Sequence, residues 1–128
     1  MPTKSKTFPP RIVEAIRKAP VIGIRIGTEP HRIIAVWAVV VAGRVFVRSW
    51  SLKPEGWYRT SLLTPRGTLQ ILNRLIPVRT VRPRSSRLKD AVSLAYKEKY
   101  HTPGSVRYVK DLSRQKSRDT TTELVPIR

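Results

Sequence analysis

One stretch constrains the fold of this sequence more than any other: two β-forming segments that meet at a two-residue turn. Residues 32–41 are the most β-branched part of the chain, and ten uncharged residues, IIAVWAVVVA, run without a break from Ile33 to Ala42. Ala42-Gly43 is typical of a tight turn, and residues 44–50, RVFVRSW, predict the return strand. The pattern indicates a β-hairpin whose first strand is buried on both faces. In the return strand, one face is expected to carry Arg44, Phe46, Arg48 and Trp50, and the other Val45, Val47 and Ser49.

Shorter patterns extend this prediction along the chain. Ile22, Ile24 and Ile26 alternate with smaller or charged residues, a second hairpin is predicted around Asn73-Arg74, and TTTELVPI predicts a closing strand. Helices are predicted after Pro9-Pro10, over 57–63, from a Ser85 or Ser86 cap to about Tyr100, and from Thr102-Pro103 to Asp111. Helices do not alternate with strands, which argues against a parallel doubly wound sheet and favours a small antiparallel barrel.

The charge of the chain is strongly unbalanced. It has 128 residues, with 26 Lys and Arg against 8 Asp and Glu, a formal net charge of +18. Such a surface attracts polyanions, so we expect non-specific binding to duplex DNA at low salt. Because the excess charge is distributed along the whole sequence, we do not expect sub-micromolar binding near physiological salt.

Several classes of chemistry find no support in the sequence. There is no cysteine, which excludes disulfides and zinc–thiolate sites, and the two histidines, His31 and His101, lie in no metal-binding pattern. The acidic residues are scattered, no phosphate-binding loop motif occurs, and no catalytic residue is nominated. No secretory signal or membrane-length apolar run occurs, so a cytoplasmic location without membrane contact is the expectation.

One cluster combines basic and aromatic side chains. Between Arg44 and Arg59 lie four cations and four aromatic rings: Arg44, Arg48, Lys53 and Arg59 with Phe46, Trp50, Trp57 and Tyr58. One interpretation is a pocket for a phosphorylated aromatic ligand, or for nucleic acid. The other is that Trp37 and Trp57 anchor the core while the arginines are solvated.

The order of short motifs resembles a known bacterial family. IAVWAVVVAGRVFVRS, WYRTSL, LNRLIPVRTVR, AYKEKY and TTTELVPI resemble the family called domain of unknown function 2255, from about Val21 onward. That family is similar to the flavin-binding split β-barrels, which include pyridoxamine-phosphate oxidase-like proteins and deazaflavin-dependent nitroreductases. The resemblance implies a six-stranded antiparallel split barrel with peripheral helices, mainly β in the α+β class. The expected single domain covers residues 9–128, after a disordered basic tail at 1–8.

The resemblance also implies a ligand, a partner and a set of site residues. A homodimer with FMN or a deazaflavin between its subunits is expected, with a possible oxidoreductase activity carried by the flavin. Phosphate contacts are assigned by position to Arg32, Arg48, Ser49, Ser51 and Lys53, with Arg59 nearby, and Trp50 and Trp57 are expected to flank the ring. The alternatives are a non-enzymatic basic barrel that binds nucleic acid and a cofactor-free barrel that serves in an assembly.

Overall fold

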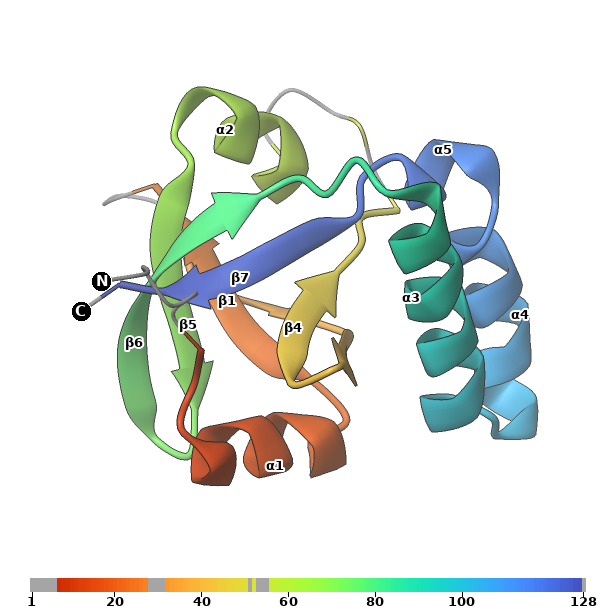
Figure 1. Cartoon of the computed structure of the whole chain (residues 1–128), viewed down its shortest axis with the longest axis horizontal. Helices are drawn as coiled ribbons and strands as arrows, with labels where there is room; N and C mark the ends of the chain where they lie inside the picture. Colours follow the sequence, from red (N-terminus) through yellow and green to blue (C-terminus); the bar gives the residue numbers. More distant parts are fainter. Residues whose placement is uncertain (1–6, 28–31, 51, 53–55, 128) are drawn as a thin grey trace.

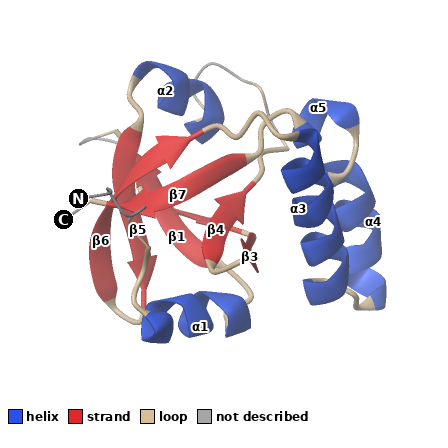
Figure 2. Cartoon of the chain, viewed as in Figure 1, coloured by secondary structure: helices blue, strands red, loops and turns tan. Residues whose placement is uncertain are grey.

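The computed structural model describes residues 7–27, 32–50, 52 and 56–127. Within these residues, seven strands form one antiparallel sheet in the order β2-β1-β5-β6-β7-β4-β3, and five helices surround it (Figures 1 and 2). The elements along the chain are α1 (Pro10–Lys18), β1 (Ile22–Ile26), β2 (Ile34–Val36), β3 (Ala38–Val41), β4 (Arg44–Val47), α2 (Trp57–Leu63), β5 (Arg66–Ile71), β6 (Arg74–Val81), α3 (Ser86–Lys99), α4 (Pro103–Leu112), α5 (Gln115–Arg118) and β7 (Thr122–Pro126). The prediction of an α+β antiparallel barrel with peripheral helices is confirmed.

The barrel has seven strands rather than the predicted six because the long apolar stretch is not one strand. It breaks at Trp37 into β2 and β3, which lie at opposite ends of the strand order. A single residue therefore joins the two edges of the sheet, so the sheet curls into a nearly closed barrel. The expectation that this stretch is buried on both faces fails in β2, where Ile34 and Ala35 are exposed.

Contacts from α3 hold the break at Trp37 in place. The Trp37 ring stacks on the Tyr100 ring with a centroid separation of 4.0 Å, and the Tyr96 hydroxyl donates to the Trp37 carbonyl oxygen at 3.0 Å. Both partners are distant from Trp37 in the sequence, so the break cannot be predicted from the local sequence of the strand.

Both predicted hairpins are present. Ala42 and Gly43 have φ values of 52° and 75° between β3 and β4, and Leu72 and Asn73 have values of 53° and 59° between β5 and β6. Two consecutive residues with positive φ are the signature of a type I′ turn, whose twist matches that of the flanking strands. The second turn lies one residue earlier than the predicted Asn73-Arg74 pair.

The two faces of β4 contribute to two different cores. Val45 and Val47 point into the barrel, where Ile12 and Ile16 of α1 fill one end. Phe46 points outward and packs with Val39 under α3 and α4, in a second cluster that includes Val92, Tyr96, Val109 and Leu112. The period-two alternation is confirmed over Arg44–Val47, but the strand ends at Val47 and not at Trp50 as predicted.

The predicted helices are confirmed to within a residue or two, with two differences at other positions. Phe8, which the prediction placed in the tail, is buried in the barrel core, and residues 115–118, for which no helix was predicted, form the short helix α5. The other tail residues before Thr7 lie outside the described part of the chain. Ser85 is the cap of α3, since its hydroxyl accepts a hydrogen bond from the Leu88 amide at 3.1 Å.

Candidate functional site

The end of β4 leads into a cluster of aromatic rings that is partly open to solvent. Trp50 is 45% exposed, and its ring meets Trp37 edge to face at 5.5 Å and Tyr108 of α4 at 6.1 Å. Trp37 and Tyr108 are in turn 6.2 Å apart. We call Trp37, Trp50 and Tyr108 the aromatic shelf. Its exposed indole offers a flat apolar surface on which a heterocycle can stack.

The shelf rests on a rigid base. Tyr100 lies parallel to the Trp37 ring, and its hydroxyl donates to the Pro20 carbonyl oxygen at 2.7 Å. Burial raises the pKa of Tyr100 to about 12, so the phenol keeps its proton and its role as donor. Tyr108 and Tyr100 were not predicted as site residues. The AYKEKY motif was the available signal, because Tyr96 and Tyr100 lie four residues apart on one helix face.

Arg48, the first phosphate ligand expected from the sequence, is a buried structural residue. It is 2% exposed, and its guanidinium donates four hydrogen bonds of 2.8 Å each to protein oxygens: Thr121 Oγ1, Ser93 Oγ, and the carbonyl oxygens of Leu112 and Lys89. Burial lowers the pKa of Arg48 to about 10, which still leaves it charged at neutral pH. Four of its five N–H groups are engaged, so Arg48 joins β4 to α3, α4 and the start of β7.

Ser49 is also held by the protein. Its amide donates to Thr120 Oγ1 at 2.8 Å, and its carbonyl oxygen accepts from Ser117 Oγ at 2.7 Å. Thr120 Oγ1 donates to the Ser117 carbonyl oxygen at 2.6 Å. The buried hydroxyls of Ser117 and Thr120 thus provide hydrogen-bond partners for the backbone groups of this segment. The T-T-T motif at 120–122 therefore closes the end of the barrel beside β4.

The other predicted residues fall into separate places. Arg59 is exposed, and its Nη1 donates to the Leu52 carbonyl oxygen at 3.2 Å, which places it against the segment just after Trp50. Arg32 is exposed ahead of β2. Trp57 packs against the barrel core and meets Tyr58 at 6.0 Å, so the structure does not bring Trp57 and Trp50 together. Ser51 and Lys53 lie outside the described residues.

Three cavities lined by described residues have volumes of about 410, 240 and 120 Å³. The cavity of about 410 Å³ lies along β1, β2 and the β5–β6 turn, and that of about 240 Å³ lies between α1, β3 and α3. None of the eight predicted residues lines any of them.

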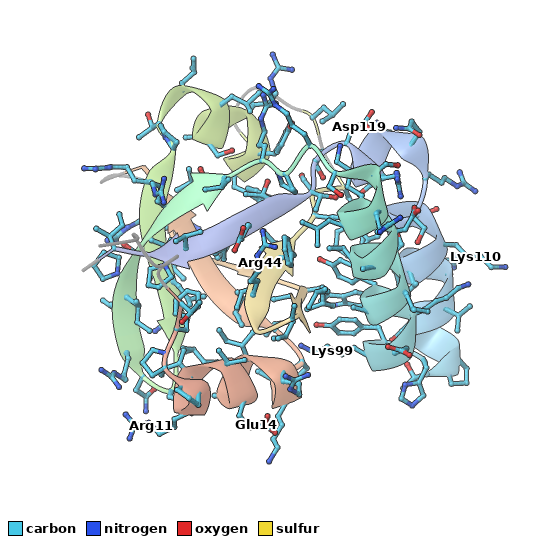
Figure 3. All side chains as sticks on the ribbon, in the orientation of Figure 1. Arg11, Glu14, Arg44, Lys99, Lys110 and Asp119 are labelled. Atoms are coloured by element: carbon cyan, nitrogen blue, oxygen red, sulfur yellow. The ribbon has the colours of Figure 1, made fainter. Side chains whose placement is uncertain are left out.

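Lys99 was not singled out from the sequence, although it lies half-buried between elements (Figure 3). Its ammonium donates to the carbonyl oxygens of Ala38 at 2.6 Å and Ile16 at 3.0 Å, so it joins α3 to β3 and α1. Burial, with a smaller contribution from Arg17, lowers the pKa of Lys99 to about 8. Its spacing of three from Tyr96 was the signal that it faces the sheet.

Other types of site are not supported. The described residues contain no group of three or more metal-ligating side chains. None of the helices in the described ranges is long and apolar enough to cross a bilayer.

The family model for uncharacterized proteins conserved in bacteria, DUF2255, matches residues 13–124. The chain belongs to this family. The resemblance inferred from the short motifs is confirmed at this level, and the family's function is not established. A search of curated proteins found no match.

Solved structures support the fold. The crystal structure of the conserved hypothetical protein Rv2991 from Mycobacterium tuberculosis is similar, with a TM-score of 0.59 over 98% of this chain and 83% of that chain. The two sequences are 11% identical. At that identity the similarity concerns the fold alone.

Proposed function

We propose that this protein binds a flavin-type heterocycle, FMN or a deazaflavin, with the ring system on the aromatic shelf. The observation that carries the proposal is the exposed Trp50 indole, held at the end of β4 by Trp37 and Tyr108. An exposed tryptophan backed by fixed rings loses little freedom when a planar ligand stacks on it.

The two halves of such a ligand fit the structure differently. We place the ring half on the shelf. Arg48 and Ser49 are both buried, and the Arg48 guanidinium is engaged with protein oxygens, so we leave the phosphate half to other donors. Arg59 is the best placed of the described cations, because it contacts Leu52, two residues after Trp50. We assign the phosphate to Arg59, with Arg32, Ser51 and Lys53 as the other proposed donors. When bound, the flavin would supply the redox chemistry, while the protein binds and orients it.

Replacing Trp50 by alanine is expected to weaken FMN or deazaflavin binding roughly 5- to 150-fold. This range corresponds to the binding free energy of about 1–3 kcal/mol that one aromatic stacking contact contributes. Arg59→Gln is expected to cost about 10-fold or more through the lost charge-assisted contact. The measurement is titration of the purified protein, followed by tryptophan fluorescence and by absorbance of the ligand.

Trp57→Phe is the matched control, because Trp57 packs on the barrel core rather than on the shelf. Its affinity should match that of the unaltered protein. If the unaltered protein binds neither ligand at any reachable concentration, the proposed function is wrong.

A second expectation is a two-fold homodimer at moderate salt. The groove of about 410 Å³ along β1 and β2 is rimmed by exposed apolar residues, Val21, Ile34 and Leu72, that a second copy would cover. Two copies combine a formal +36, twice the +18 of one chain, so low salt should favour dissociation.

Light scattering across a salt series measures this. Ile34→Asp should give a monomer at every salt concentration. Leu63→Asp should leave the dimer intact, because Leu63 is 88% exposed on α2 and does not line the groove. A monomeric mass for the unaltered protein at both low and high salt would contradict the expectation.

A further inference from the structure

The net positive charge of this chain is concentrated in one segment of the sequence, because that segment has no acidic residue. Residues 56–89 contain eight Lys or Arg and no Asp or Glu: Arg59, Arg66, Arg74, Arg79, Arg82, Arg84, Arg87 and Lys89. This quarter of the chain holds α2, β5, β6 and the start of α3. The expectation that the excess charge is evenly distributed is therefore too simple.

The β5–β6 hairpin turns part of this charge to one surface. Leu69, Ile71 and Val78 point into the barrel, so the alternate residues point outward. Besides Val81 at the end of β6, the outward residues of the two strands are Arg66, Thr68, Gln70, Leu75, Pro77 and Arg79, and we call these six the basic face. The hairpin lies on the side of the barrel away from α3 and α4, and the described helices leave its outer surface uncovered (Figure 2).

The centre of the basic face is a pair of arginines. Arg66 and Arg79 are direct cross-strand partners and both are exposed. Such partners have Cβ atoms about 5 Å apart, and like charges in this position destabilise a sheet. On the next strand, Arg25 of β1 is the partner of Thr68, which extends the same surface.

Within the described ranges, neither arginine of this pair forms an ion pair with a carboxylate. The acidic residue that comes nearest in the register is Glu123 of β7, two residues from the partner of Arg79. Glu123 already receives two hydrogen bonds from Arg44, at 2.8 and 3.0 Å. Within the part of the chain that the structure describes, the arginine pair thus has unmatched positive charge that an external anion can satisfy.

We propose that the basic face binds double-stranded nucleic acid through its phosphates, without reading sequence. Arginine forks with neighbouring hydroxyl and amide groups, here Thr68 and Gln70, are the donors that phosphates use. The face is an exposed sheet surface rather than a groove, and β6 extends over about 25 Å, the length of seven or eight base pairs. A run of phosphates along a duplex matches such a surface better than one small anion does.

The composition of the face also selects the duplex over a single strand. Proteins that hold single strands stack bases on exposed aromatic rings. None of the six residues of the basic face is aromatic, and the aromatic shelf lies elsewhere, at the β2–β3 break, after β4 and on α4. The inference is independent of the proposed flavin site, because the two use different residues.

The test is the salt dependence of binding to a labelled mixed-sequence DNA duplex of about 20 base pairs. Non-specific binding with a dissociation constant in the micromolar range is expected near 150 mM salt. The double variant Arg66→Gln/Arg79→Gln should reduce the slope of log affinity against log salt by about 1.8, which corresponds to about 30-fold weaker binding at about 150 mM salt. Its thermal unfolding midpoint should be unchanged or higher, because cross-strand repulsion is relieved.

The matched control is Lys97→Gln/Arg107→Gln, which removes the same charge from exposed positions on α3 and α4. Its slope should stay near that of the unaltered protein. Equal losses in the two double variants would overturn the proposal in favour of diffuse attraction. Tighter binding to a single strand of equal length, or equal arginine-dependent binding to vesicles with about 30% anionic lipid, would also overturn it.

Discussion

Replacing Arg48 by methionine is expected to destabilise the protein by about 3–5 kcal/mol, the largest effect of a single substitution that we foresee. The side chain is nearly fully buried and donates to four oxygens on three other elements. Methionine fills a similar volume but donates nothing, so those acceptors lose a shared partner inside the protein. Urea unfolding followed by tryptophan fluorescence measures the free energy change.

Two further variants give this prediction its controls. Ser93→Ala removes one of the four acceptors and should cost only about 0.5–1.5 kcal/mol. Arg48→Lys keeps the charge but not the planar fork, so its loss should fall between the other two. A stable Arg48→Met protein that has instead lost FMN affinity would return Arg48 to the role of phosphate ligand.

Gly67→Ala is expected to cost about 3 kcal/mol or more, and for a different reason. Gly67 faces Ile26 across β5 and β1, where the two backbones come unusually close. An added Cβ would overlap the carbonyl oxygen of Arg25 and lie 2.9 Å from the Ile26 Cα atom. Both are backbone atoms, so the strands must separate to make room, and the pairing that closes this side of the barrel is disturbed.

Gly104→Ala is the control for this prediction. It lies near the start of α4, and a Cβ there meets no atom within 4 Å. Alanine is the better helix former, so this variant should be neutral or up to about 1 kcal/mol more stable. Thermal or urea unfolding of both variants distinguishes the cases. An equally small change in the free energy of unfolding of both variants would show that β1 and β5 can separate at little energetic cost.

Local signals in the sequence account for most of the secondary structure. The Ala42-Gly43 turn, the alternation of isoleucines in β1 and the Ser85 cap act over a few residues, so propensity and periodicity are enough to locate them. The same alternation correctly separated Phe46 from Val45 and Val47. The break at Trp37 could not be found in this way, because the residues that fix it, Tyr96 and Tyr100, come about 60 positions later in the chain.

The candidate site depends on which side chains stay exposed, and local sequence patterns do not determine that. The sequence pointed to residues 44–59, and Trp50 and Arg59 lie where a ligand can reach them. It also selected Arg48 as the leading phosphate donor, because an arginine near the end of a strand is expected to be exposed to solvent or to bind a ligand. The period-two pattern assigns Arg48 to the outer face of β4, but it does not predict which elements cover that face.

By itself, then, the sequence determined the hairpins, the helix ends, the two-sided alternation of β4 and a net charge that must attract anions. The tertiary structure decided which side chains remain available to do so. Packing of α3 and α4 on β4 turned Arg48 inward to protein oxygens, whereas the pairing of β5 with β6 left Arg66 beside Arg79 on an open surface. The physical reason is that the exposure of a charged side chain is set by partners distant in sequence, whereas its face on a strand is set by its neighbours.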